Sequence, residues 1–583
     1  MRTKGLLSRL TLITCLAFGA ATATGCDDEN DPATHVKKLD ADNRRPAAMR
    51  KLREMFQSRL STARPPDNVD DPQVKQFLDA VLPAVATAFT AHPEEVSTRK
   101  EAIEILAGSH DLRAVPALLS ALQFHVGNSD SERIALRAAQ AIKELHPANN
   151  PQVVQGLLSA IDRASANSGN SPAIREAVVG ALGLIGDRAA VESLKRLLQR
   201  PIRDQEIRTA RASADALGLI GDASAADALV YGLFLNIRSG SSRANAYNNC
   251  ARALVRLGPA ASVPRLIATV NGENVLVNDL LRSYETEPGM PPMPPGFMKA
   301  QAIDVLRNFA DPSAVDALTA RMRDRAEVAN VRAAAAETLA YTGLSIPRED
   351  PRRGAIFDAI AAVFNEAPPG DEHDMAPSVS PALVILGDPR APALITRRLN
   401  DRALQPTNMT LARMALLMPL ASAIRHADFA AFDRIAQTTQ TQLDATIHED
   451  PGAEEEVRPV INQLTAIRAV ASVARDCEDG QIACYQGKLT DQDKNVVRKA
   501  AYMIAWTGSE DAAARTALLA RADIPDMMVR RSLHTAIDSL SPHGCAECVT
   551  RLEAIIASEA GQESKSVMHL EAQMLIARLR NRH

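Results

Sequence analysis

Two pairs of cysteines near the end of the sequence are the residues whose spacing most directly suggests chemistry. Cys545 and Cys548 have two residues between them, a spacing that occurs in redox sites, in metal sites and in short disulfides. Cys477 and Cys484 enclose EDGQIA, which we expect to form a turn between two helices. In an exported protein disulfides are the first expectation for both pairs. For Cys545 and Cys548, a redox role, a metal or free thiols stay open as alternatives.

Other residue types that carry chemistry form no catalytic pattern. The sequence has no HExxH, GxSxG or P-loop motif, and no GxGxxG after an expected strand. Residues 371–374 (DEHD) offer ligands for a divalent cation, but the prolines and glycine just before them favour a solvated linker. We therefore predict no catalytic residue, no metal and no cofactor, and we expect a protein that is not an enzyme.

The first 26 residues have the features of an export signal. Three basic residues lie within the first nine, residues 11–25 carry no charge, and the stretch is too short to span a membrane comfortably. The sequence ATGC at 23–26 resembles a bacterial lipobox with Cys26 as the lipidated residue. We expect a lipoprotein of the bacterial cell envelope, on the periplasmic side or at the outer membrane. Ordinary cleavage without lipidation is the alternative.

Composition excludes several classes of protein. Hydrophobic residues make up 46% of the chain, which excludes disorder, and aromatic residues make up only 3%, which argues against a β-sandwich or barrel. The formal net charge of −4 excludes a generally basic nucleic-acid-binding protein. Removal of the basic signal segment would make the mature chain more acidic still.

Internal repetition sets the expected fold. The heptapeptide ALGLIGD occurs at 181–187 and again at 216–222, and apolar residues before each copy recur with the spacing of one helix face. Gly-Asp then breaks the helix, and a second, shorter amphipathic helix follows. Weaker copies continue along the chain. The sequence predicts an all-α protein, an α-solenoid of about twelve helix pairs between roughly residues 73 and 558, with a terminal helix at 565–581.

This pattern resembles the HEAT repeat, in the short variety also found in phycobilin lyases. Arg175 and Arg208 occupy the family's early-helix arginine position, and Asp187 and Asp222 its turn position. The resemblance implies a solenoid fold and says little about activity. We expect the arginine and aspartate positions to pair between adjacent repeats as a structural ladder. Exported bacterial members often carry a cysteine pair across a turn, which implies a disulfide between Cys477 and Cys484.

The expected array restricts the roles open to Cys545 and Cys548. A redox CxxC belongs at a strand-to-helix junction, which the helical pattern does not provide. A zinc site built from both cysteine pairs would need thiolates about 2.3 Å from the metal, whereas turns two repeats apart are separated by about 20 Å. A structural disulfide between Cys545 and Cys548 is therefore the favoured prediction.

The pattern divides the chain into five segments. We predict a lipoprotein signal peptide at 1–25, an acidic and polar tether with one helix over 46–63 at 26–72, and solenoid segments at 73–283 and 298–583, the second ending in a capping helix. A proline- and methionine-rich insertion at 284–297 separates them and is either a spacer or a partner-binding strip. The candidate binding residues of the insertion are Met290, Pro291, Pro292, Met293, Pro294 and Pro295.

These observations together predict a membrane-anchored, exported HEAT-repeat scaffold that is not catalytic. It would bind another protein through an elongated solenoid surface, and we expect no nucleic acid and no small-molecule substrate. The alternatives are a lyase-like or tetrapyrrole-handling enzyme, which rests on fold analogy, and a structural component of the envelope.

Overall fold

The computed structural model describes residues 28–123, 129–147, 149–163, 171–239, 242–286, 293–507, 512–559 and 566–582. Its internal contacts define two compact units, Met1–Ala190 and Val191–His583, here called the N-terminal and C-terminal units. No helix in the described part of the chain is long and apolar enough to cross a membrane. The predicted signal peptide and Cys26 lie outside the described residues.

The N-terminal unit is a stack of helices. Its first three helices precede the repeats. Helix α4 contacts α5 and α6, α5 contacts α6 and α7, and α6 contacts α8. The helices are α1 (Pro32–Lys38), α2 (Arg45–Thr62), α3 (Pro72–Ala91), α4 (Val96–Gly108), α5 (Val115–Gln123), α6 (Ser129–Leu145), α7 (Pro151–Arg163) and α8 (Ser171–Ile185).

Residues 28–72 are folded, although the sequence predicts a tether there. Helix α2 covers the helix expected over 46–63, and it packs on α3 and α4. Met49, Leu52 and Phe56 are almost fully buried, and the Phe56 ring stacks on Phe77 of α3 at 6.2 Å. The apolar face of α2 therefore starts the solenoid, because burying it removes these side chains from water. The predicted tether is corrected to the first helices of the N-terminal unit.

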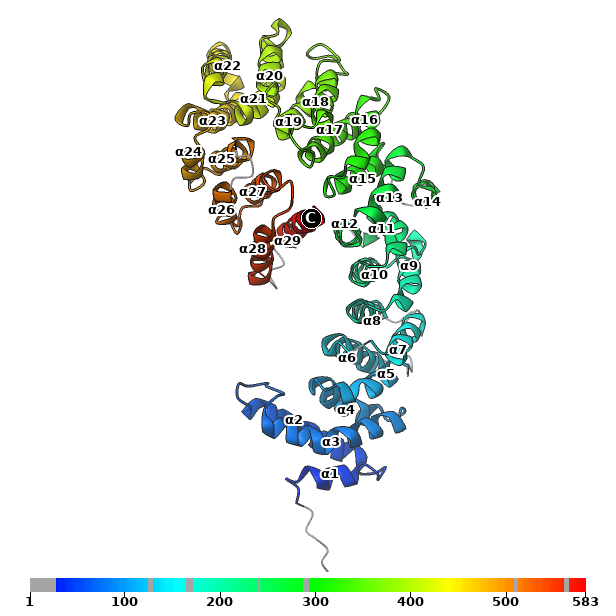
Figure 1. The fold of residues 1–583 in the computed structure, drawn as a ribbon. Helices are drawn as coiled ribbons and strands as arrows, with labels where there is room; N and C mark the ends of the chain where they lie inside the picture. Colours follow the sequence, from blue (N-terminus) through cyan, green and yellow to red (C-terminus); the bar gives the residue numbers. More distant parts are fainter. Residues whose placement is uncertain are drawn as a thin grey trace, which may run out of the picture. The chain divides into compact units, whose positions relative to one another are not determined.

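The C-terminal unit continues the pattern over twenty-one helices of the described residues (Figure 1). They are α9 (Val191–Leu198), α10 (Ile207–Ile220), α11 (Ala226–Leu233), α12 (Tyr247–Leu257), α13 (Pro259–Asn271), α14 (Val275–Thr286), α15 (Phe297–Arg307), α16 (Val315–Arg323), α17 (Ala329–Leu344), α18 (Pro351–Phe364), α19 (Ala376–Leu386), α20 (Ala391–Leu399), α21 (Thr410–Ala423), α22 (Phe429–Glu449), α23 (Glu454–Asp476), α24 (Ile482–Lys488), α25 (Lys494–Thr507), α26 (Ala512–Leu519), α27 (Met527–Ser539), α28 (Ala546–Ser558) and α29 (Ser566–Asn581).

The first helices of successive pairs lie against one another. Each helix contacts the next one in the series α15, α17, α19, α21, α23, α25, α27 and α29. The stack continues through the predicted boundary at 284–297, because α13 packs on α15 and α16. The insertion therefore does not separate two solenoid segments; the division of contacts falls after Ala190 instead. This arrangement confirms the predicted all-α solenoid.

Two features depart from simple repetition. Between α11 and α12, β1 (Asn236–Ser239) and β2 (Ser242–Asn245) form an antiparallel hairpin. At the other end, α29 packs on α12, and Arg578 of α29 donates to the carbonyl oxygen of Asn308 (2.9 Å). The segment from α12 to α29 therefore closes into a ring within the C-terminal unit (Figure 1).

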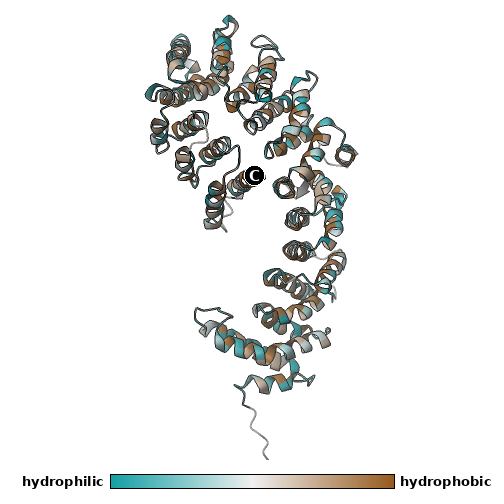
Figure 2. Cartoon of the chain, viewed as in Figure 1, coloured by the Kyte–Doolittle hydropathy of each residue, from teal (hydrophilic) through white to brown (hydrophobic). Residues whose placement is uncertain are grey.

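The repeated heptapeptide explains the turns and the close stacking. Gly221 ends α10 with φ of 73°, a left-handed conformation that favours glycine. Asp222 then caps the following turn by accepting from the Ser224 amide (2.9 Å). A Cβ atom on Gly218 would lie 2.8 Å from the backbone of Ala253 in α12. Small residues therefore permit close contacts between helices. Along the helices, hydrophobic and hydrophilic residues alternate (Figure 2).

The expected arginine–aspartate ladder is wrong where the structure shows the partners. Arg332 forms an ion pair with Glu366 (2.5 Å), and Arg530 forms one with Glu559 (2.9 Å). In both cases the partner of the arginine is a glutamate at the end of the same helix pair. The aspartates at the turn position, Asp187, Asp222, Asp311 and Asp388, instead accept from backbone amides two residues later.

Candidate functional site

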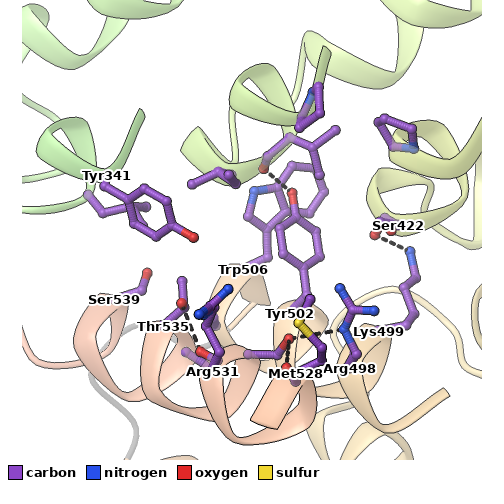
Figure 3. Close-up of a pocket in the computed structure, with 18 of the residues that line it drawn as sticks. Tyr341, Ser422, Arg498, Lys499, Tyr502, Trp506, Met528, Arg531, Thr535 and Ser539 are labelled. Atoms are coloured by element: carbon purple, nitrogen blue, oxygen red, sulfur yellow. Dashed lines mark hydrogen bonds between the residues drawn. The ribbon is translucent and has the colours of Figure 1, made fainter. Parts of the chain in front are cut away.

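The ring of the C-terminal unit encloses a pocket of about 400 Å³ (Figure 3). Its walls come from helices α17, α18, α19, α21, α23, α25 and α27, which are spread over more than two hundred positions of the sequence. The volume falls within the range typical of sites for small molecules, about 300–1,000 Å³. The apolar side chains that line it are Leu344, Pro381, Val384, Ile385, Met418, Pro419, Val470, Met528 and the aromatic residues Tyr341, Tyr502 and Trp506.

Helix α25 forms one wall and is held by hydrogen bonds to neighbouring helices. Lys499 donates to the carbonyl oxygens of Ser422 (2.6 Å) and Ile424 (2.7 Å) at the end of α21. These carbonyls have no partner within their own helix, so a cation there also complements the helix dipole. Burial lowers the pKa of Lys499 well below its usual value. The Tyr502 hydroxyl donates to the Val384 carbonyl of α19, which ties α25 to a third helix.

Trp506 closes the same wall near the end of α25. Arg425 lies over its ring at 4.1 Å, and Arg348 donates to the carbonyl oxygens of Ala505 (2.7 Å) and Trp506 (2.9 Å). The indole also packs so closely on Gly387 that a Cβ atom there would lie 2.2 Å from Nε1. Trp506 is 7% exposed. It is therefore a fixed, almost fully buried wall of the pocket.

Cationic groups occupy the polar part of the pocket. Arg498 donates through Nε to Ser532 Oγ (3.3 Å) and approaches Asn495 Oδ1 (3.5 Å), so neutral oxygens hold its guanidinium. Arg353 donates to the carbonyl oxygens of Ile346 (3.4 Å) and Leu386 (2.6 Å). Burial lowers the pKa of Arg353 to about 10, and the nearby charge of Arg348 acts in the same direction.

A second candidate surface lies on α14, the helix that falls outside the pair pattern. Val275 is 66% exposed and Leu276 is 40% exposed in its first turn. The helix is nevertheless fixed, because the Tyr284 hydroxyl accepts from the Asn236 amide (2.6 Å) and donates to the Phe234 carbonyl (2.9 Å). The structure thus presents two adjacent aliphatic side chains to solvent on a firmly held helix.

The predicted partner-binding insertion follows α14 directly. Its residues Met290, Pro291 and Pro292 lie outside the described residues. Met293 is half-buried, whereas Pro294 and Pro295 are exposed just before α15. The insertion and the exposed turn of α14 are therefore parts of one segment between α13 and α15.

The four paired cysteines lie where the sequence places them. Cys477 ends α23 and forms a disulfide with Cys484 of α24, with Cα atoms 5.7 Å apart. Cys545 precedes α28 and forms a disulfide with Cys548, with Cα atoms 5.2 Å apart. Neither disulfide belongs to the pocket lining. Both close a turn beside a helix end.

Two polar clusters contain residue types that bind metal ions, but carboxylates in both clusters already have other partners. His92, Glu94 and Glu95 approach one another within 4.8 Å, but the Glu95 carboxylate already accepts from Arg45 and from Thr98 (2.8 Å). In the loop at 371–374, Asp374 forms an ion pair with Arg398 (2.8 Å) and caps α19. Asp374 is therefore held by these contacts with its side chain 8% exposed, whereas the sequence predicts a solvated linker for this loop.

Sequence reasoning missed the pocket itself. Arg498 and Met528 sit on helix faces whose spacing does not distinguish them from ordinary repeat positions. Arg348 reaches across 158 positions to Trp506, a separation that helical periodicity cannot report. The only local signal is the cluster Arg498, Lys499, Tyr502 and Trp506 at near one-turn intervals, which marks one face of α25.

Comparison with known proteins supports the repeat. Residues 174–200 match the PBS lyase HEAT-like repeat, and the chain therefore contains a HEAT-like repeat at that segment. No similar protein was found among the curated sequences.

Three of the solved structures that match this chain are similar to it at low sequence identity. Human deoxyhypusine hydroxylase in complex with glycerol is 16% identical, over 54% of this chain and 99% of that chain, with a TM-score of 0.20. Importin13 in its cytosolic state is 8% identical over 96% and 95%, with a TM-score of 0.39. Importin beta is 13% identical over 94% and 79%, with a TM-score of 0.29.

Proposed function

We propose that this protein is a membrane-anchored, exported scaffold that binds another protein without catalysing a reaction. A HEAT-repeat solenoid is consistent with a protein-binding scaffold, because each repeat adds surface to a continuous array. The observation that carries the proposal is the exposed first turn of α14, the helix that leads into the proline- and methionine-rich insertion. Adjacent exposed aliphatic side chains on a fixed helix are typical of surfaces that become buried on binding.

Replacing Val275 with aspartate tests this surface. Val275 is the first residue of α14, where an acidic residue favours the helix, so the fold is retained while a charge enters the docking surface. We expect recovery of a bound protein from the envelope fraction to fall about tenfold or more, the loss expected when a charge is buried without a partner. The measurement is affinity purification of the full chain after cross-linking in cells, with quantification by mass spectrometry.

The matched control replaces Leu411 with aspartate. Leu411 is 72% exposed in the first turn of α21, so the change has the same chemistry at the same kind of helix position. Partner recovery should equal that of the unmodified chain. Equal recovery with V275D and the unmodified chain would refute a docking role for α14.

Anchoring is tested separately at Cys26. Acyl chains bind membranes through about 0.8 kcal/mol per buried CH₂ group, and several chains together give durable attachment. We expect Cys26→Ser to move the protein from the membrane fraction to the soluble fraction and to abolish incorporation of labelled palmitate. The control is Cys15→Ser, in the uncharged stretch of the predicted signal peptide. It should leave both the membrane association and the palmitate incorporation unchanged. A Cys26→Ser protein that still sediments with membranes would exclude this anchor.

A further inference from the structure

The lining of the pocket has more cationic than anionic side chains. Its lining contains one carboxylate, Glu337, which forms an ion pair with Arg307 (3.0 Å). Arg531 also lines the pocket and pairs with Glu571. Glu337 and Arg531 are therefore each paired with an opposite charge. The other cationic side chains of the lining are those of Arg353, Arg498 and Lys499.

Three cations of the lining have only neutral oxygens as partners. Arg353, Arg498 and Lys499 donate to carbonyl, hydroxyl or amide oxygens, and among the described residues none of the three has a carboxylate within ion-pair distance. Arg353 and Lys499 are each committed to two carbonyl oxygens. Arg498 is different, because its guanidinium has five N–H donors and only two weak contacts. It is the group with donors left for an anion.

The lining around Arg498 indicates where the charged group and the apolar part of a ligand would lie. Asn495 and Ser532 lie beside the guanidinium and supply neutral polar groups. The rest of the lining combines polar groups that have partners, among them Arg531 and Lys499, with apolar side chains such as Met528, Trp506 and Tyr341. We propose that this pocket binds a free small molecule with an aliphatic body and a single carboxylate, which pairs with Arg498.

Charge complementarity and pocket size select this class of ligand. An arginine held in an apolar pocket forms charge-assisted hydrogen bonds with a carboxylate that are stronger than neutral ones. The aliphatic walls favour an apolar body, because its burial removes hydrocarbon surface from water. The volume of about 400 Å³ is that of a small-molecule site, and an uncharged chain of the same length would leave Arg498 without an anionic partner. The inference is independent of the α14 surface.

The sole tryptophan makes the test direct, because Trp506 is part of the pocket wall. The full chain is titrated with dodecanoate and with dodecanol while Trp506 fluorescence is recorded, and calorimetry provides a second measurement of binding. We expect dodecanoate to cause a saturable change and to bind about tenfold more tightly than dodecanol, which is the difference made by one charge-assisted hydrogen bond.

Two variant pairs locate the ligand. Arg498→Gln should weaken dodecanoate about tenfold and leave dodecanol unchanged, whereas Arg352→Gln, on an exposed arginine outside the lining, should change neither. Met528→Glu should abolish binding of dodecanoate. Met527→Glu is the matched control, since Met527 and Met528 are neighbours in α27 with exposed fractions of 39% and 42%, and only Met528 lines the pocket.

Three results would overturn the proposal. The first is the absence of saturable binding of dodecanoate by both fluorescence and calorimetry. The second is equal affinity for dodecanoate and dodecanol, or unchanged affinity in Arg498→Gln, because the carboxylate would then not be recognised. The third is displacement only by a peptide with an apolar carboxyl terminus, which would make the occupant a protein segment. Loss of partner recovery in V275D bears on α14 alone and leaves these outcomes unaffected.

Discussion

Replacing Gly387 with alanine is expected to destabilise the C-terminal unit by about 2–5 kcal/mol, the sum of a left-handed backbone penalty and overpacking. Gly387 ends α19 with φ of 70°, so a side chain there is disfavoured by its backbone alone. Its Cβ atom would also lie 2.2 Å from Nε1 and 2.4 Å from Cδ1 of Trp506. The indole cannot swing aside freely, because Tyr502 stacks on it at 5.9 Å and Arg425 lies over it.

Gly221→Ala separates the two causes of this loss. Gly221 ends α10 with φ of 73°, and a Cβ atom there would meet nothing within 4 Å. It should therefore cost only the backbone penalty, about 1–2 kcal/mol. Urea unfolding followed by Trp506 fluorescence and by circular dichroism gives both values. Equal losses in the two variants would show that the Trp506 contact relaxes at no cost.

The helix pairs were predictable because their causes are local. The spacing of apolar residues before ALGLIGD predicts a buried helix face, and the glycine and aspartate that follow it predict a stop and a cap. The terminal helix expected at 565–581 corresponds to α29, and the helix expected over 46–63 corresponds to α2. Each of these features is decided within about one helix length of sequence.

Contacts between distant repeats could not be predicted in the same way. The repeat pattern places an arginine early in a helix but does not say which acid will reach it. The sequence therefore predicts the turn aspartates as partners, whereas Arg332 and Arg530 pair with the glutamates Glu366 and Glu559. The pocket depends on contacts such as Tyr502 to Val384, 118 positions apart, which exist only because the ring closes.

The tether was wrong for a related reason. Residues 27–45 are rich in charge and lack helical periodicity, so they are typical of a solvated segment. In the structure Arg45 is 2% exposed, donates to the Leu39 carbonyl (2.7 Å) and pairs with Glu95 of the following helix pair. A buried charge of this kind is recognisable only when its partner is known, fifty positions later in the sequence.

Replacing Arg530 with methionine is expected to destabilise the last repeats by about 3–5 kcal/mol, because the change removes the guanidinium that forms two hydrogen bonds with the buried Glu559 carboxylate. Arg530 and Glu559 have side chains that are 1% and 7% exposed, and two hydrogen bonds of 2.9 and 3.0 Å join them. The guanidinium also donates to the carbonyl oxygens of Ile524 (2.9 Å) and Asp523 (2.7 Å). Hydrogen exchange of α27 and α28 measures the loss where it occurs.

Two further variants decide whether burial of the pair is the cause. Arg551→Met removes an arginine whose pair with Asp523 is exposed, with side chains 42% and 57% accessible, and should cost no more than about 1 kcal/mol. The double variant R530M/E559L should recover much of the loss, because it removes the buried carboxylate together with its arginine partner. A double variant less stable than R530M alone would instead show that Glu559 stabilises the fold through contacts other than Arg530, such as its contact with His569 (3.0 Å).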